Sequence, residues 1–292
     1  MIVVTGATGQ LGRLVIDRLL ERVPAASVVA AVRSPEKAAD LAARGVEIRQ
    51  ADYDRPESFK AALAGADKVL LISSNEVGKR AAQHRAVVAA AKETGVSLLA
   101  YTSLTDGPDS PLSLGTEHGA TERDIRDSGL PFTFLRNNWY TENNLGDLAG
   151  AIERGAIASN AGDGRIASAT RDDFAAAAAV VLTGEGHENR VYELTGDTAW
   201  SFADLAAEVS RQCGKPVAHQ PVSDEQYHAI LAGVGLPGPL VDVLVDANAR
   251  IREGALATVT DDLRTLIGRP TTPLDVAVKA ALDGGKGSGG HA

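Results

Sequence analysis

The sequence has few of the residues on which several classes of protein depend. Its one cysteine, Cys213, excludes an internal disulfide and a zinc site built from several cysteines. Its 38 acidic and 29 basic residues give a net charge of −9, which argues against a nucleic-acid-binding surface. It has no apolar run of membrane-spanning length and no signal-peptide pattern at its start. We therefore expect a cytoplasmic protein that contains no metal. We expect it to bind neither nucleic acid nor a membrane. A homo-oligomer is compatible with the sequence.

A glycine-rich turn lies near the start of the chain, in the segment VVTGATGQLGR of residues 3–13. Two valines favour a strand, and from Gln10 apolar residues recur at helical spacing, so a strand leads through the turn into a helix. In such a turn Gly6 permits a tight bend, Gly9 lets backbone approach a pyrophosphate, and Gly12 lets the helix pack closely. Because a helix N-terminus also attracts phosphate, the segment favours a dinucleotide site over an ordinary strand-to-helix loop.

The end of the second expected strand bears on which dinucleotide is bound. This strand covers residues 28–33 and ends in Arg33, where NAD-binding proteins place an Asp or Glu on the ribose 2′-hydroxyl. A guanidinium cannot accept that hydrogen bond, but it pairs well with a 2′-phosphate, and Lys37 lies one helical turn further on. The sequence therefore favours NADPH, with a surface arginine at a strand end as the alternative.

Strands and helices alternate through the first 136 residues, which is typical of an α/β protein with a Rossmann, doubly wound parallel sheet. After the first strand, we expect strands at 28–33, 47–50, 68–72, 97–102 and 131–136, and helices at 78–94 and 116–128.

The pattern loosens beyond residue 140, where we expect a smaller lobe that covers the substrate. It contains an alanine-rich helix at 173–183, a strand at 191–194, a helix from Ser201, and a strand and helix at 216–222 and 224–232. We predict three parts: an NADPH-binding domain at 1–140, joined by 155–183; the lobe, mainly 141–282; and a flexible tail at 283–292.

Several further motifs point to a family. Beyond TGATGQLG the chain carries AVR, QADYD, LLISSNEVGKR, YTSL, LRNNWYTEN and GDGRIASATRDD. Together they resemble the NmrA-like branch of the atypical short-chain dehydrogenase/reductases, and within it the bacterial NADPH-dependent quinone oxidoreductases. The glycine motif is common to the whole superfamily, whereas LLISS, RNNWY and ASATR are more selective. The resemblance extends to about residue 282.

This resemblance implies which residues bind NADPH. Two of the implied groups also follow expected strands, where ligands bind in parallel sheets, although Ser and Asn at such places can simply begin turns. The implied contacts are Gly6, Ala7, Thr8, Gly9, Gln10 and Leu11; Arg33; Ser73, Ser74 and Asn75; Asn137, Asn138, Trp139, Tyr140, Thr141 and Glu142; and Ala169, Thr170, Arg171, Asp172, Asp173 and Phe174, which touch the cofactor or close over it.

The catalytic pair of most short-chain dehydrogenases is missing. In that pair, Tyr-x-x-x-Lys, the lysine lowers the tyrosine pKa so that the hydroxyl can move a proton at neutral pH. Where the pair is expected, the chain has His118 and Glu122 instead. Its five tyrosines are followed four residues later by Glu57, Thr105, Asn144, Gly196 and Leu231.

This absence separates two kinds of substrate. Reducing a simple ketone yields an alkoxide of high pKa that needs a placed acid, whereas reducing a quinone yields a hydroquinone anion delocalised over a ring. We therefore predict an NADPH:quinone oxidoreductase that transfers hydride directly, without flavin, and works by proximity and orientation. Two alternatives stay open: an NmrA-type NADP(H)-binding redox sensor that acts through a protein partner without turnover, and an isomerase or sugar-modifying enzyme.

Candidate side chains can be named for positioning the quinone. Tyr140 and Trp139 would form flat walls, and His118, Asn143 and His84 would donate hydrogen bonds to a quinone oxygen. The alternatives are that His84 packs on a helix face, that His118 only lies near a helix start, and that Trp139 belongs to the core.

Overall fold

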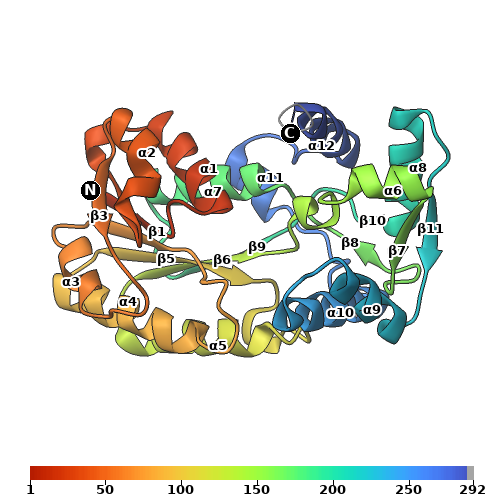
Figure 1. The fold of residues 1–292 in the computed structure, drawn as a ribbon. Coiled ribbons are helices and arrows are strands. Elements are labelled where there is room, and N and C mark those ends of the chain that lie inside the picture. Colours follow the sequence, from red (N-terminus) through yellow and green to blue (C-terminus); the bar gives the residue numbers. More distant parts are fainter. Residues whose placement is uncertain (288–292) are drawn as a thin grey trace.

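The computed structural model describes residues 1–287, and at its centre lies a parallel sheet with helices on both faces (Figure 1). Within this range the sheet has seven strands in the order β3-β2-β1-β4-β5-β6-β9, with every pair parallel. The predicted doubly wound α/β fold is confirmed. The strands are β1 Ile2–Thr5, β2 Val28–Val32, β3 Glu47–Gln50, β4 Lys68–Leu71, β5 Leu98–Leu104, β6 Phe132–Asn137 and β9 Arg190–Leu194.

Helices cover the two faces because side chains of a strand point alternately to opposite sides. On β1, Val4 packs in one hydrophobic cluster and Val3 in the other, and both are fully buried. One face is covered by α1 Gln10–Leu20, α2 Ala39–Ala43, α7 Arg171–Thr183 and α11 Asp262–Ile267, and the other by α3 Ser58–Ala62, α4 Arg80–Thr94 and α5 Gly115–Ser128 (Figure 1). Short 3₁₀ turns lie at η1 Ala25–Ser27, η2 Pro35–Ala38, η3 Gly107–Asp109 and η4 Thr141–Asn144.

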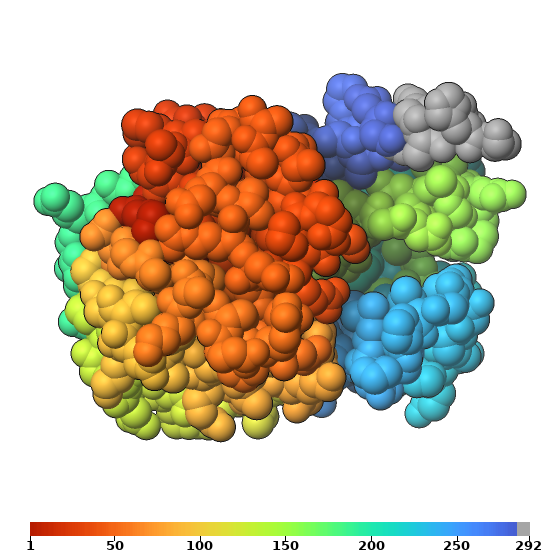
Figure 2. All heavy atoms as spheres, turned by 60° about the vertical axis from the view of Figure 1, so that its left-hand side comes forward, coloured from red at the N-terminus to blue at the C-terminus, as the bar shows by residue number. Residues whose placement is uncertain are grey.

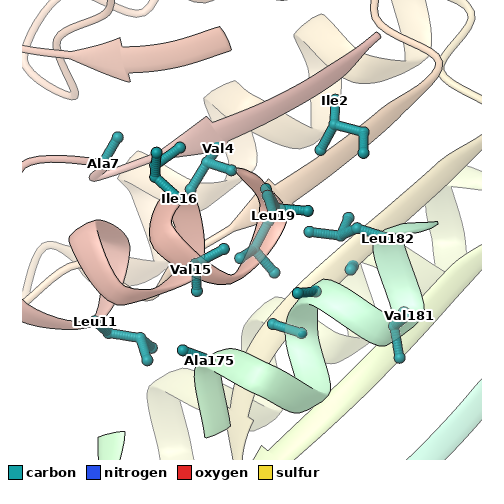
Figure 3. Close-up of a cluster of buried hydrophobic side chains, with 14 of the residues drawn as sticks. Ile2, Val4, Ala7, Leu11, Val15, Ile16, Leu19, Ala175, Val181 and Leu182 are labelled. Atoms are coloured by element: carbon teal, nitrogen blue, oxygen red, sulfur yellow. The ribbon is translucent and has the colours of Figure 1, made fainter. Parts of the chain in front are cut away.

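The contact between α1 and α7 joins distant parts of the chain. Leu11, Val15 and Leu19 of α1 lie against α7, which presents alanines and Leu182 (Figure 3). Small side chains let the two helix axes approach closely, so the first helix of the sheet is held by a segment about 160 positions later in the chain.

A smaller lobe lies beside the carboxyl ends of the strands (Figure 1). It has its own buried cluster, which includes Trp139, Trp200, Phe202 and Ile251. Its elements are α6 Leu148–Arg154, β7 Ala156–Ser159, β8 Arg165–Ile166, β10 Trp200–Ser201, α8 Phe202–Cys213, β11 Ala218–Pro221, α9 Asp224–Gly233, α10 Gly238–Arg252 and α12 Leu274–Gly287. Two small pairs form there, β10 with β8 and β11 with β7.

The chain crosses between sheet and lobe more often than the expected division at residue 141 suggests. Strand β9 pairs with β6, and α7 and α11 pack on the main sheet, whereas β7 and β8 of the expected joining segment 155–183 lie in the lobe. We therefore keep the two-part division as a proposal, with β9 and α11 added to the first part.

The carboxyl terminus differs from the expected tail. Helix α12 continues to Gly287, so residues 283–287 are helical where we expected a flexible segment, and residues 288–292 lie outside the described residues. Among residues 1–287 no helix has both the length and the apolar character required to cross a membrane.

Gly12→Ala tests the close packing of α1 on the turn. A Cβ at Gly12 would lie 2.3 Å from the Gly6 carbonyl oxygen and 2.7 Å from Ala7 Cα, both backbone atoms that cannot rotate away. We expect the variant to lose about 1–3 kcal/mol of unfolding free energy and to bind dinucleotide more weakly, as measured by denaturant titration and cofactor titration. Gly233→Ala, in open space on α9, is the control, and equal stabilities of the two variants would contradict this account.

Candidate functional site

A cavity of about 1940 Å³ lies between the carboxyl ends of the main strands and the lobe. Residues that follow β1, β2, β3, β4, β5 and β6 line one side of it, and residues of α6, α9 and α10 line the other. The space-filling view shows a recess between the first half of the chain and the lobe (Figure 2). The cavity therefore lies where a doubly wound sheet binds ligands, since the strand order reverses at β1.

The glycine turn forms one end of the cavity. Gly6 has a φ of +59°, and its carbonyl accepts the Gly9 N–H at 2.9 Å immediately before α1 begins. The first N–H groups of α1 therefore form part of the cavity wall, where they could bind a phosphate. The lining residues of the turn are Gly6, Thr8, Gly9, Gln10 and Leu11, whereas Ala7 lies behind them, fully buried.

Two cations lie at the same end, beyond β2. Arg33 and Lys37 are exposed and line the cavity, and among residues 1–287 neither has a carboxylate within ion-pair distance. The neighbouring Arg13 is occupied, because its guanidinium pairs with Asp40 and donates to the Lys37 carbonyl. Arg33 and Lys37 are thus available to an anion such as a 2′-phosphate.

The loop after β4 is held from below by side chains of α4 and β5. Ser73 N–H donates to Thr102 Oγ1 at 2.8 Å, Ser74 N–H donates to His84 Nε2 at 3.0 Å, and Arg80 Nε donates to the Ser74 carbonyl at 2.6 Å. Ser73, Ser74 and Asn75 all line the cavity.

His84 is therefore a support of this loop rather than a cavity side chain, which corrects its expected contact with a quinone. It is fully buried, its Nε2 accepts from Ser74, and its Nδ1–H donates to Thr121 Oγ1 at 2.9 Å. Burial, together with the Arg80 charge, lowers the pKa of His84 to about 3, so the ring is neutral.

His118 does line the cavity. The side chain is 5% exposed, and Nδ1 shares a 2.7 Å hydrogen bond with the hydroxyl of the fully buried Tyr101. Burial, then the charge of Arg80, holds the pKa of His118 well below its ordinary value. A neutral ring can donate a hydrogen bond to a bound acceptor, but it is not a strong acid.

Glu122, which replaces the lysine of the usual pair, has a structural role. It is fully buried, and its carboxylate accepts two hydrogen bonds from Arg136, at 2.8 and 2.7 Å, and one from Ser103 Oγ at 2.7 Å. Arg136 also pairs with Glu193 at 2.7 Å. This network ties α5 to β5, β6 and β9, and it leaves no Tyr-Lys type acid in the site.

The end of β6 and the segment after it line the cavity with Asn137, Asn138, Trp139, Tyr140 and Asn143. Arg171 lies 4.6 Å above the centre of the Tyr140 ring and donates to Asn143 Oδ1 at 2.7 Å. Because its oxygen is occupied, Asn143 has its amide N–H₂ free to donate into the cavity.

Thr141, Glu142 and residues 169–174 do not line the cavity, contrary to the expected cofactor contact. They support the cavity wall from behind: Thr141 shares a hydrogen bond with Ser168, and Glu142 accepts the Arg171 N–H at 2.9 Å. Asp172 pairs with Arg18 of α1 at 2.5 Å. Among them, Arg171 holds Tyr140 and Asn143 in position, and the contact of this motif with a bound cofactor stays a prediction.

The sequence did not reveal the far end of the cavity. It is walled mainly by apolar side chains of the lobe, among them Phe202, Leu231, Leu240 and Leu244. The Arg154–Asp147 ion pair also contributes to this wall. Helix α9 buries none of its residues, so its apolar side chains are directed to the cavity or to solvent rather than to a core. Apolar residues on a helix usually predict core packing, and only the fold shows that these line an apolar chamber.

Comparison with known proteins gives the family. Residues 6–185 match the NAD(P)H-binding family. The chain belongs to this family. It is 51% identical over 278 residues to quinone oxidoreductase 2 of Escherichia coli strain K12, covering 95% of this chain and 97% of that one.

Solved structures agree over the whole fold. The Escherichia coli NADPH-dependent quinone oxidoreductase complexed with NADPH superposes with a TM-score of 0.94 at 50% identity, covering 97% of this chain and all of that one. A triphenylmethane reductase of Citrobacter sp. complexed with NADP(H) gives 0.93 at 45% identity, covering 96% and 100%. The resemblance to the NmrA-like quinone oxidoreductases is thus confirmed.

The buried histidines predict a loss of stability in mild acid. In the unfolded chain a histidine is protonated near pH 6.5, whereas in the folded protein His84 is protonated only near pH 3. Its contribution to stability is therefore complete above pH 6.5 and falls as the pH drops below it, by up to about 1.4 kcal/mol per pH unit. His84→Asn, whose amide does not titrate, should show a shallower decline between about pH 6.5 and 5. The exposed His228→Asn is the control, and parallel curves for the two variants would contradict the prediction.

Glu122→Gln tests the buried ion pair. The change leaves the Arg136 charge with Glu193 as its remaining close partner in the interior, and we expect a loss of about 3 kcal/mol of unfolding free energy. Glu193→Gln, at the half-exposed end of the same network, should cost about 1 kcal/mol or less. Denaturant titration measures both, and a smaller loss for Glu122→Gln than for Glu193→Gln would refute this order.

Proposed function

We propose that the protein is an NADPH-dependent oxidoreductase that reduces quinones. The observation that carries the proposal is the continuity of one cavity, which joins the glycine turn to a chamber with largely apolar walls. A dinucleotide fits the first part, and the second suits a neutral aromatic acceptor. The similar Escherichia coli protein is an NADPH-dependent quinone oxidoreductase, and the Citrobacter relative is named for triphenylmethane substrates, which are also aromatic.

The proposed cofactor is NADPH because Arg33 and Lys37 are free cations where an NAD-binding protein has a carboxylate. The glycine turn, Ser73 to Asn75 and Asn137 to Tyr140 would hold the remainder. When bound, NADPH supplies the hydride and its two electrons. The absence of flavin and metal from the reaction stays a prediction.

The side chains of the site can position a quinone but offer little acid catalysis. Tyr140 and Trp139 are flat walls, and His118 and Asn143 are hydrogen-bond donors. Burial raises the pKa of the cavity tyrosine Tyr53 to about 12, and His118 is neutral. Since a hydroquinone anion is stabilised by delocalisation, it can leave the site and take its proton from water, so positioning is the main contribution of the protein.

A redox sensor would use the cofactor part of the cavity alone. The lobe chamber gives room beside it for a second molecule, which favours turnover over sensing. A cytoplasmic location and a homo-oligomeric state stay predictions.

NADPH oxidation followed by absorbance, with naphthoquinone as acceptor, tests the function and the cofactor choice together. We expect turnover with NADPH without added flavin and a preference over NADH that Arg33→Asp lowers at least tenfold, because the variant repels a 2′-phosphate and can accept from a 2′-hydroxyl. Arg22→Asp, an exposed arginine outside the cavity, is the charge-matched control and should keep the preference. NADPH binding without turnover of any quinone would refute the enzyme and favour the sensor.

A further inference from the structure

Arg80, at the start of α4, is a buried cation in the wall of the cavity. It is 5% exposed and lines the cavity beside Ser74 and His118. Its Nε is used by the Ser74 carbonyl, but no atom of residues 1–287 accepts a hydrogen bond from the buried Nη1. An arginine that is buried with so few partners is costly and keeps an incompletely compensated positive charge in the cavity wall.

The nearest carboxylate neutralises Arg80 incompletely. Glu117 Oε2 lies 3.6 Å from Nη1, beyond hydrogen-bond distance, and is itself buried without a hydrogen-bond partner. The other oxygen of Glu117 accepts the Gly78 N–H at 3.1 Å, which fixes the carboxylate in this position. The fold holds the two charged groups near each other, but no hydrogen bond joins Nη1 to Oε2.

The electrostatic influence of Arg80 extends across the site. After burial, its charge is the next cause that lowers the pKa of both His84 and His118. Burial raises the pKa of Tyr140, and the Arg80 charge is among the influences that oppose this rise. Because both histidines are neutral, Arg80 supplies the positive charge at this point of the wall.

We propose that Arg80 is a catalytic residue that stabilises the negative charge formed on a quinone oxygen. The inference rests on the proposed function. The quinone accepts a hydride, with its electron pair, from NADPH, which becomes NADP⁺. The product is a hydroquinone monoanion, which takes a proton from water. The Arg80 guanidinium would stabilise this oxyanion, and the neutral His118 ring would donate a hydrogen bond beside it.

This assignment explains why the site can dispense with a tyrosine acid. A fixed guanidinium in a buried wall interacts strongly with a developing charge, because water does not screen it and no reorganisation is needed during the reaction. Donors of this kind change turnover by about 10²–10³-fold when removed. The neutral quinone gains little from Arg80 before reduction, so the stabilisation acts mainly on the charged product-like state.

The first measurement is the turnover of a series of quinones with different substituents. Arg80→Met should reduce kcat/KM about 100-fold, and the reduction should grow with the basicity of the hydroquinone anion, because a more localised charge depends more on the guanidinium. Arg80→Lys should restore part of the rate. Lys79→Met removes a neighbouring exposed cation of the same cavity rim and should leave the series unchanged.

The second measurement uses equilibrium binding and involves no turnover. With NADP⁺ present, calorimetry compares a hydroxynaphthoquinone that is ionised at neutral pH with its neutral methoxy counterpart. Arg80→Met should lower the affinity for the anion at least tenfold relative to the affinity for the neutral compound. Glu117→Gln, which keeps the oxygen that Gly78 uses but removes the opposing charge, should strengthen anion binding, and it keeps the proposal testable if Arg80→Met does not fold.

Three results would overturn the role of Arg80: equal slowing of all quinones, equal weakening of the two naphthoquinones, or a loss confined to NADP⁺ affinity. Each would leave Arg80 as a support of the Ser74 loop or a cofactor contact. These results differ from failure of the proposed function, in which the unmodified protein itself would reduce none of the quinones.

Discussion

The close approach of α1 to the turn after β1 is the constraint on which the rest of the site depends. With no Cβ at Gly12, the N-terminus of α1 lies against the Gly6 carbonyl, so its free N–H groups open into the cavity. The other side of α1 packs on the alanines of α7. At its own N-terminus α7 carries Asp173, which binds Thr272 N–H and Arg269 from the segment that leads to α12. One chain of contacts thus connects the phosphate end of the cavity to the lobe.

A polar layer beneath the cavity takes the place of the usual catalytic pair. Its groups are linked in order: the Ser74 backbone to His84, His84 to Thr121, and Thr121 to the backbone of Glu117, whose carboxylate faces Arg80. Tyr101 and His118 form a second link to the same wall. Since a buried polar group without a partner is costly, this layer fixes the positions of Ser74, Arg80 and His118 within narrow limits.

The sequence predicted the parts of the fold that depend on local pattern. Buried strands and the glycine turn are visible as apolar runs and spacing, and Ser201 with Asp204 forms the capping interaction that begins α8. Asp54 and Glu57 have the same spacing but form no such cap: α3 begins only at Ser58, whose Oγ bonds the backbone of Asp52 and Arg55. Local spacing offers the same signal in both cases, and only the tertiary path of the chain decides between them.

The functional residues were less predictable, because the burial of a side chain and the direction in which it points are properties of the assembled fold. His84 and His118 look alike in sequence, yet His84 supports a loop and His118 lines the cavity. Arg80 lies within the LLISSNEVGKR motif, but nothing in the spacing shows that its side chain is buried. Likewise, the return of β9 to the sheet requires a pairing partner, β6, that is far away in sequence.

The distribution of positive charge makes the two ends of the cavity different. In a chain of net charge −9, free cations at Arg33 and Lys37 lie at one end, and the incompletely paired Arg80 lies further in, beside His118. A dinucleotide with a 2′-phosphate is then favoured with that phosphate at the first end, which directs the remainder of the molecule toward Tyr140 and the lobe. An acceptor in the apolar chamber would meet it beside Arg80, where the new negative charge is stabilised. Binding orientation and charge stabilisation would therefore both follow from placing positive charge at two separate points of one cavity.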